Sequence, residues 1–219
     1  AASFALLVYA SAWLKRHHPG IFACALLNSQ PMGFYAPAQI VRDAREHGVE
    51  VLPVCINRSF WDNVMEPNGR GGLALRLGFR QIKAMREEEA HWIAAARGNG
   101  YQEVPQVWRR ASTSPQILEA LAEADAFASL GLSRRAALWE AKALRSANPL
   151  PLFAGDMDGE AISEPAATLP EMTLGEEVVE DYAALRLTLR AHPMALLRPI
   201  LTPHAAMIQD MTEASPTLH

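Results

Sequence analysis

Proline and glycine divide this chain into short segments, and this division is what most limits the folds open to it. The 219 residues include 15 prolines and 13 glycines. His17-His18-Pro19-Gly20 interrupts an apolar stretch, Gln30-Pro31 ends the next one, and Gly48 follows a stretch whose apolar residues recur at helical spacing. These signals predict helices over residues 3–18, about 20–29 and about 37–47.

A run of turn residues at 66–72 separates two weakly alternating stretches. Such a run joins paired strands, so residues 60–65 and 73–79 are predicted to form a β-hairpin, with a short strand at 49–53 before it. The rest is predicted as helix over 81–97, several short helices over 105–145, a linker over 146–172 and an amphipathic helix over 175–191. The predicted fold is mainly α with a small β-hairpin.

Charge is distributed unevenly along the chain. The net charge of −4 and the pI of about 6.0 argue against a uniformly basic nucleic-acid binder. Residues 58–110 nevertheless hold nine basic and six acidic side chains, whereas residues 156–190 hold nine acidic ones opposed only by Arg186 and Arg190. The middle of the chain is therefore suited to phosphate contact and the later segment is not. Taken one at a time, most of these charges also fit a solvated helical surface.

The cysteines and the first apolar run indicate in which cellular compartment the protein is expected. Cys24 and Cys55 are isolated, which suits a reducing cytoplasm rather than a disulfide scaffold. The apolar run at residues 4–14 spans about 11 residues, and a bilayer requires about 20, so a buried helix is predicted there. No secretory signal is indicated, and no membrane contact is expected. His17 and His18 lack partners at metal-ligand spacing, so no metal site is predicted.

Two segments are too specific in residue type to be generic core: LNSQPMGFY at residues 27–35 and DAREHGVEVLPVCINRS at 43–59. They resemble the fingers region of bacterial C-family DNA polymerases, the DNA polymerase III alpha subunits, and in particular the error-prone, damage-tolerance branch. The resemblance implies a DNA-directed DNA polymerase, a nucleotidyltransferase acting in DNA repair and translesion synthesis. Fingers cations face nucleotide or template phosphates, and Lys15 within WLKRHHP is the candidate here.

A first helix-hairpin-helix is expected from the same resemblance. Residues 77–86, followed by a helix ending at Arg97, are similar to the first such motif of the family, which binds duplex DNA without reading its sequence. The candidate DNA contacts are Arg80, Lys83 and Arg86. Residues 84–86, Ala-Met-Arg, replace the glycine-rich turn whose backbone amides meet phosphate in the family. A purely structural helical pair is the alternative.

A second helix-hairpin-helix is expected in SPQILEALAEADAFASLGLSRRAALWEAKAL, residues 114–144. Ser114 is the predicted N-cap and Gly131 the predicted end of the second short helix. Asp125 stands where the family has glycine, and Arg134 and Arg135 are the remaining candidate DNA contacts. A structural role is the alternative, with the following residues at packing positions: Leu118, Leu121, Phe127, Leu130 and Trp139.

The linker holds a candidate partner site. Residues 148–153, Asn-Pro-Leu-Pro-Leu-Phe, fall where replicative members of the family carry a peptide that binds the sliding clamp. Leu152 and Phe153 would fill an apolar pocket on the clamp or on a damage-tolerance partner protein. The glutamine that usually begins this peptide is missing, and a simple linker is the alternative.

The resemblance also implies what this chain lacks. In the family, the catalytic aspartates lie in a palm domain upstream of the matched segment, so no catalytic residue is expected here. Mg²⁺ is expected for the whole enzyme and none for this chain, which alone is predicted to be inactive. Residues 169–199 resemble the lead-in to an oligonucleotide-binding barrel that is itself absent. The chain is therefore expected to be a fragment of a larger protein.

The expected division of the chain is as follows: residues 1–59, the end of the fingers; 60–145, the β-hairpin and tandem helix-hairpin-helix; 146–172, a linker; 173–199, a helix leading to the barrel; 200–219, a tail. Two other identities remain open: a stand-alone helix-hairpin-helix module that binds DNA or a partner, and a fragment of the replicative alpha subunit. For the polymerase fragment, primer–template duplex is the expected partner. Residues 1–35 are expected to expose apolar surface.

Overall fold

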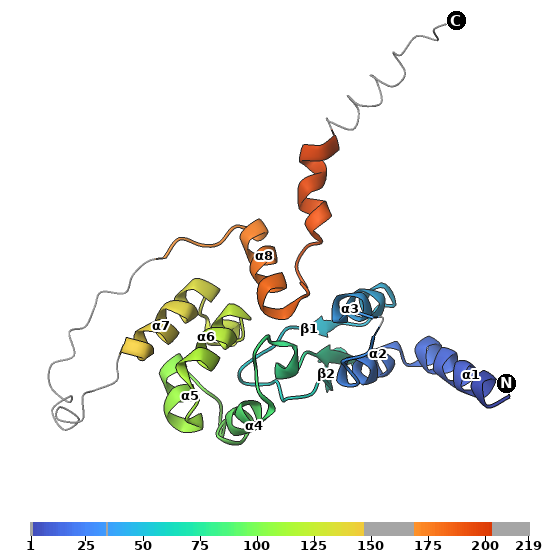
Figure 1. The fold of residues 1–219 in the computed structure, drawn as a ribbon, viewed down its shortest axis with the longest axis horizontal. Helices are drawn as coiled ribbons and strands as arrows, with labels where there is room; N and C mark the ends of the chain where they lie inside the picture. The colour runs from blue at the N-terminus through green and yellow to red at the C-terminus, as the bar shows by residue number, and fades with distance from the viewer. Residues whose placement is uncertain (1, 34, 147–168, 203–219) are drawn as a thin grey trace, which may run out of the picture.

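A computed structural model describes residues 2–33, 35–146 and 169–202 of the chain, which form short helices around a small sheet (Figure 1). In chain order the elements are α1 (Ala2–His17), α2 (Pro19–Asn28), α3 (Pro37–Glu46), β1 (Val51–Leu52), β2 (Val64–Pro67), β3 (Leu73–Arg76), the 3-10 helix η1 (Phe79–Gln81), α4 (Glu87–Ala95), α5 (Val104–Ala111), α6 (Pro115–Glu123), the 3-10 helix η2 (Ala128–Leu130), α7 (Arg134–Ser146) and α8 (Leu174–Leu185). Residues 193–202 are also helical. The predicted fold class, mainly α with a small β-hairpin, is confirmed.

The predicted helix boundaries follow from local chemistry. Pro19 begins α2 because the first turn of a helix tolerates a missing N–H. The Ser114 hydroxyl accepts a hydrogen bond from Ile117 N and caps α6 as predicted, and Gly131 ends η2 in the left-handed conformation. At α8 a capping box joins Thr173 to Glu176.

The sheet contains the predicted hairpin and one further pairing. Its strand order is β1-β3-β2, with β2 antiparallel and β1 parallel to β3. The Asn68 side chain closes the hairpin loop by accepting hydrogen bonds from Arg70 N and Gly72 N, each at 3.0 Å. Since β1 follows α3 and β3 leads into η1, the sheet connects the first helices to the later ones.

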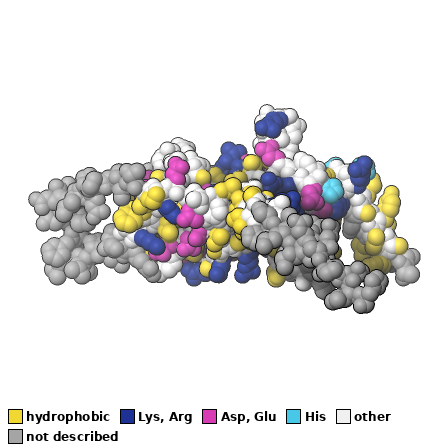
Figure 2. Space-filling view, turned by 90° about the horizontal axis from the view of Figure 1, so that it is seen from above, with side chains coloured by type: hydrophobic (Ala, Val, Ile, Leu, Met, Phe, Trp, Pro, Cys, Tyr) yellow, Lys and Arg dark blue, Asp and Glu magenta, His cyan; other side chains and the backbone are white. Residues whose placement is uncertain are grey.

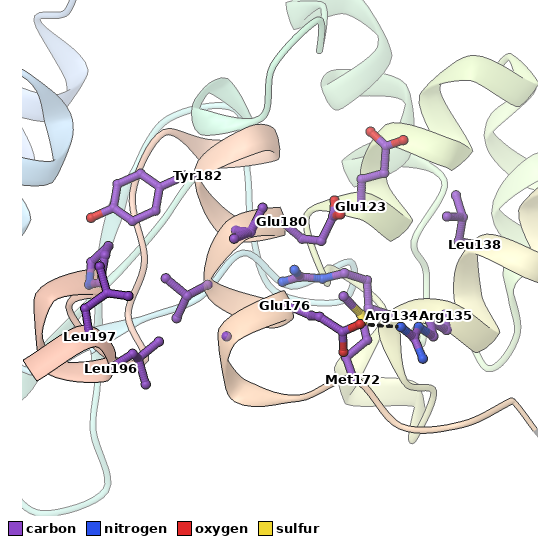
Figure 3. Close-up of a pocket in the computed structure, with 14 residues that line it drawn as sticks. Glu123, Arg134, Arg135, Leu138, Met172, Glu176, Glu180, Tyr182, Leu196 and Leu197 are labelled. Carbon is purple, nitrogen blue, oxygen red and sulfur yellow. Dashed lines mark hydrogen bonds and ion pairs between the residues drawn. The ribbon is translucent and has the colours of Figure 1, made fainter. Parts of the chain in front are cut away.

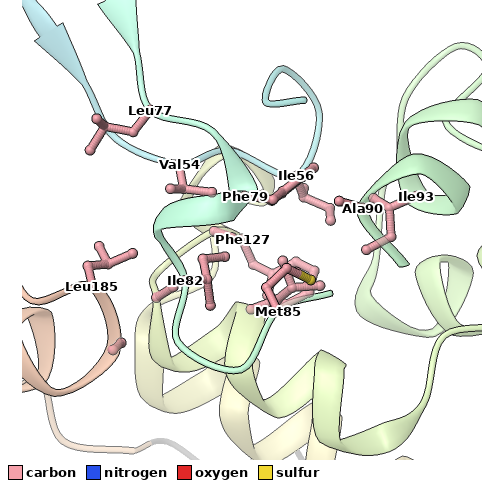
Figure 4. Close-up of a cluster of buried hydrophobic side chains, with 14 of the residues drawn as sticks. Val54, Ile56, Leu77, Phe79, Ile82, Met85, Ala90, Ile93, Phe127 and Leu185 are labelled. Carbon is pink, nitrogen blue, oxygen red and sulfur yellow. The ribbon is translucent and has the colours of Figure 1, made fainter. Parts of the chain in front are cut away.

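One hydrophobic core runs from the sheet into the later helices. Ile56, Leu77 and Phe79 leave the strands and pack with Ile93 of α4 and Phe127 after α6 (Figure 4). These five side chains are completely buried. Burial of this kind stabilises a protein by about 1.5–3 kcal/mol for each large apolar side chain. The sheet and helices α4 to α7 therefore form a continuous unit.

Helix α1 projects from this unit at the N-terminal end of the molecule (Figure 1). Its large apolar side chains are 42–72% exposed: Phe4, Leu6, Leu7, Val8, Tyr9, Trp13 and Leu14. In the space-filling view, hydrophobic side chains gather at this end (Figure 2). The expected apolar exposure of residues 1–35 is thus confirmed for this helix.

Three structural expectations are corrected. The helix predicted over 81–97 begins only at Glu87, because residues 82–86 form the turn of a hairpin. The helix predicted over 175–191 ends at Leu185, because Arg186 takes a left-handed conformation with φ 62° and turns Leu187 into the core. Trp139, expected at a packing position, is 55% exposed, whereas Leu118, Leu121 and Phe127 are buried as predicted.

Candidate nucleic-acid interface

The first hairpin connects η1 to α4. Ile82 and Met85 anchor it in the core, while Lys83, Ala84 and Arg86 are exposed. Ala84 has a φ of 65°, a left-handed conformation that glycine usually supplies. The turn therefore keeps a left-handed backbone although alanine replaces the family's glycine there.

The exposed cations of this hairpin differ in their partners. Arg86 Nη2 lies 2.9 Å from Glu89 Oε1, and the Arg86 side chain is 69% exposed. Lys83 has no side-chain partner within the described part of the chain. The Glu89 side chain is 14% exposed, but the Arg86 side chain extends into solvent, which screens the pair, so both cations remain available to an external anion.

Gly78 allows the chain to enter this hairpin. A Cβ at this position would lie 2.3 Å from Trp61 O and 2.5 Å from Asp62 C and O. The Gly78 N–H donates to Asn63 Oδ1 at 3.0 Å. The close backbone approach thus requires glycine one residue before η1.

Arg80, a predicted DNA contact, is the centre of a structural junction. Its guanidinium donates to Asn28 O at 2.7 Å and to Gln30 O at 2.9 Å, and it pairs with Asp62 at 2.5 Å. Only 18% of its side chain is exposed. Arg80 therefore joins the end of α2, where the NSQPMGFY segment begins, to the first hairpin.

Asn63 completes this junction. It is 2% exposed, and its backbone and side-chain N–H groups both donate to Asn28 Oδ1, at 2.8 and 2.7 Å. Asn28 Nδ2 returns a hydrogen bond to Asn63 O at 2.9 Å. Sequence reasoning missed Asn63, because a lone asparagine before a strand carries no periodic signal.

The second hairpin connects α6 to η2 and α7. Its turn residue Asp125 has a φ of 57°, so this turn is also left-handed without glycine. Ala126 O accepts a hydrogen bond from Ile56 N at 2.8 Å. The segment 43–59 is thereby tied to this hairpin, and its residues Asn57 and Ser59 are bound to Tyr101 and Leu77.

Arg134, a predicted DNA contact, lies in a buried ion cluster. Its side chain and that of Asp181 are each 3% exposed and paired with one another, and Arg134 also lies 3.3 Å from Glu177 Oε2. Arg190 Nη1 donates to both carboxylate oxygens of Asp181 at 2.7 and 2.8 Å, and Arg190 Nη2 donates to Asp125 Oδ2 at 2.7 Å. The cluster therefore holds α8 and the segment after it against the second hairpin.

The remaining predicted site residues have different environments. Arg135 lines an apolar cavity of about 960 Å³ between α7, α8 and residues 193–202, where it pairs with Glu176 at 3.1 Å (Figure 3). Lys15 Nζ lies 2.9 Å from Asp43 Oδ1 at a partly exposed site. Leu152 and Phe153 lie outside the described residues.

Burial alters the pKa of two groups behind the hairpins. Desolvation lowers the pKa of Arg97, whose guanidinium donates to Ile56 O and Ser59 O. Desolvation also raises the pKa of Tyr101, which therefore stays protonated and donates to Ile93 O at 2.8 Å. Both side chains therefore act as hydrogen-bond donors to backbone carbonyl groups behind the hairpins.

Within the described ranges, no group of three or more His, Cys, Asp or Glu side chains could hold a metal ion. These residues do not fit the magnesium site of a polymerase. None of the described helices is both long and apolar enough to cross a bilayer.

Comparisons with known proteins identify related chains. A family model described as "Helix-hairpin-helix motif" matches residues 48–137, which include both hairpin turns. A protein named "Error-prone DNA polymerase" from Ruegeria pomeroyi is 66% identical over 207 residues, covering 93% of this chain and 19% of that protein. Proteins of the same name from Sinorhizobium medicae and Brucella abortus are 51% and 53% identical, covering 90% of this chain and 20% and 18% of their own lengths. The chain thus spans about a fifth of the curated relatives it matches.

Proposed function

Because this chain is homologous over about nine-tenths of its length to a segment of the error-prone DNA polymerases, we propose that it is the part of such an enzyme that holds primer–template duplex. The whole protein would then be a DNA-directed DNA polymerase acting in DNA repair and translesion synthesis in the bacterial cytoplasm. Its magnesium-binding carboxylates would lie outside this chain. The chain alone would hold and position DNA without extending it.

The first hairpin is the observation that carries this proposal. Lys83 and Arg86 flank the left-handed turn at Ala84, and all three residues are exposed. A turn of this shape allows close approach of a phosphate to the backbone, and the two cations add charge that does not depend on base sequence. Such contacts suit an enzyme that must hold any template.

We assign Arg80 and Arg134 positioning roles within the same site. Both guanidinium groups are mostly buried and paired within the protein, Arg80 at the α2 junction and Arg134 in the ion cluster. Residues 1–59 would form the end of the fingers, and the Arg80 junction would connect them to the duplex-binding hairpin. Lys15 would face phosphates from the fingers side.

Salt dependence of duplex binding tests the proposal. Fluorescence anisotropy with a primer–template duplex should give a log–log plot of affinity against salt whose slope gains about −0.9 for each neutralised phosphate. Lys83→Ala and Arg86→Ala should each make the slope shallower by up to about 0.9. Lys142→Ala, which removes an exposed cation on α7 without a partner among the described residues, is the matched control. A slope near zero for the unaltered chain would refute duplex binding.

We also propose that the linker binds the sliding clamp through Leu152 and Phe153. A peptide of residues 146–156 should bind purified clamp, and the double change to alanine at these two positions should abolish binding. Equal binding by the altered peptide would contradict this assignment.

A further inference from the structure

The end of α8 lies directly against the first hairpin. Lys83 N donates to Ala184 O at 2.9 Å, and Leu185 belongs to the same buried cluster as Ile82 (Figure 4). Arg186 follows with a φ of 62°. Its side chain is exposed and has no partner in the described part of the chain. Two unpaired cations, Lys83 and Arg186, therefore extend from backbone segments joined by a hydrogen bond.

The second hairpin has the opposite electrostatic character. Asp125 occupies its turn, and Asp181 and Glu177 lie within the same ion cluster. Among the described residues, these three carboxylates pair with two guanidinium groups, those of Arg134 and Arg190. Desolvation acts to lower the pKa of Arg190, but attraction to Asp181, Asp125 and Glu177 raises it overall, so this cation is committed to its protein partners. A phosphate approaching the Asp125 turn would meet net negative charge.

The same cluster determines where Arg186 lies. Arg190 binds the second hairpin through Asp125 and binds α8 through Asp181. Thr188 Oγ1 donates to Asp181 Oδ2 at 2.6 Å, and Leu187 is 1% exposed. The four residues after α8 are thus fixed on both sides, and Arg186 is fixed with them.

We propose that the two hairpins have different tasks, an inference that rests on the duplex-binding function proposed above. The first hairpin binds phosphate through Lys83 together with Arg186, which α8 contributes. The second hairpin binds no phosphate; its Asp125–Arg190 pair anchors the segment after α8 and so positions Arg186 beside Lys83.

Two substitutions at residue 186 test the contact. Arg186→Gly removes the charge and suits the left-handed conformation, so it should leave the fold intact. The salt slope of duplex binding should become shallower by about 0.9, and Arg186→Lys should restore it. Lys142→Ala should leave the slope unchanged. If the unaltered chain binds duplex and Arg186→Gly keeps its full slope, the inference is wrong while the proposed function stands; if the unaltered chain shows no salt-dependent binding, the proposed function itself fails.

The second hairpin and the anchor are tested separately. Arg135→Ala should leave the salt slope unchanged, and a slope shallower by about 0.9 would overturn the division of tasks. Arg190→Met should accelerate hydrogen exchange of the Lys83 amide, whose acceptor is Ala184 O. In that background Arg186→Gly should no longer alter the slope. Unchanged exchange at Lys83, or an undiminished effect of Arg186→Gly, would exclude the anchoring role.

Discussion

Ala84 and Asp125 occupy the two hairpin turns in a conformation that usually belongs to glycine, with φ of 65° and 57°. A left-handed residue other than glycine costs about 1–2 kcal/mol, and aspartate tolerates this conformation better than alanine. Asp125 also gains an ion pair with Arg190, whereas the side chain of Ala84 gains no polar contact. Alanine in the first turn is therefore expected to cost more free energy than aspartate in the second.

Ala84→Gly should raise the free energy of unfolding by about 0.5–1 kcal/mol, because the relief of backbone strain exceeds the added flexibility of the unfolded chain. Urea denaturation measures this change. Ala183→Gly, at an exposed position within α8, is the control and should lower stability by about 1 kcal/mol. A loss of stability in Ala84→Gly would contradict this reasoning.

Gly78→Ala should lower the free energy of unfolding by about 2–3 kcal/mol, since its Cβ would overlap backbone atoms of Trp61 and Asp62 that cannot move independently. Thermal unfolding gives the measurement. Gly33→Ala is the matched control, because no atom lies within 4 Å of the added Cβ. Equal effects at both glycines would show that the close approach at Gly78 carries no cost.

For single residues, the sequence identified where the hairpins depart from the family pattern, but it did not predict the conformation or the contacts of those residues. The absence of glycine at Ala84 and Asp125 argued against phosphate contact by the turn backbone, and both positions nevertheless keep the left-handed backbone. From the sequence, Arg80 and Arg134 were candidate DNA contacts. Their buried acceptors, Asn28 O and Asp181, lie 52 and 47 residues away in the chain, beyond the reach of local patterns.

Among the elements, α8 depends most on polar contacts. Asp181→Ala should lower the free energy of unfolding by about 3 kcal/mol, because Arg134 would remain buried without its main partner. Hydrogen exchange should accelerate first in residues 174–190. Glu180→Ala changes a neighbouring carboxylate outside the cluster and should have little effect. Uniform acceleration over the whole chain would show that α8 is not a separate local unit.

Glu66, in the sheet, should make the free energy of unfolding depend on pH. Burial acts to raise the pKa of Glu66, but Arg76 and Arg58 lower it overall. A lowered carboxyl pKa stabilises the fold above the ordinary value of 4.5, and this stabilisation is lost as the pH falls through the folded pKa. Glu66→Gln should therefore lose stability at pH 6 and differ less from the unaltered chain near pH 3.5. An equal difference at both pH values would contradict the assignment.

The end of α8 shows why the apolar periodicity of the sequence could not predict where this helix ends. Apolar residues at Val178, Tyr182, Leu185 and Leu189 continue a helical pattern past the observed end at Leu185. A left-handed turn at Arg186 also returns Leu187 to the core, so a helix and a turn satisfy the same burial requirement. The hairpin was predictable because a run of turn residues separates its strands, although the turn predicted at 66–72 includes Glu66 and Pro67, which belong to β2.

For the whole molecule, helix α1 is distinguished by the exposure of its large apolar side chains. A helix that is apolar on all sides is normally enclosed by other structure. We propose that another part of the polymerase proposed above covers it. The chain alone should bind a hydrophobic dye such as ANS, and Leu7→Glu should reduce the dye signal without changing the melting temperature. Unchanged dye binding in Leu7→Glu would place the exposed surface elsewhere.

Limited proteolysis should distinguish helix α1 from the later helices. Residues 1–35 should be cut before residues 75–140, because within the described part of the chain α1 packs mainly against α2 and pairs with α3 through Lys15–Asp43, whereas the later helices share a continuous core. Equal resistance of the two regions would show that α1 is held more firmly than these contacts imply.

The Arg80 junction also has a consequence for how the proposed enzyme senses its template. The Arg80 guanidinium binds the end of α2, and Arg80 lies three residues before Lys83 in the chain. In the proposed enzyme, a shift of the first hairpin would therefore act on the end of α2 through Arg80. In the proposed enzyme, a change in the bound duplex would in this way reach residues 1–59 as a mechanical displacement.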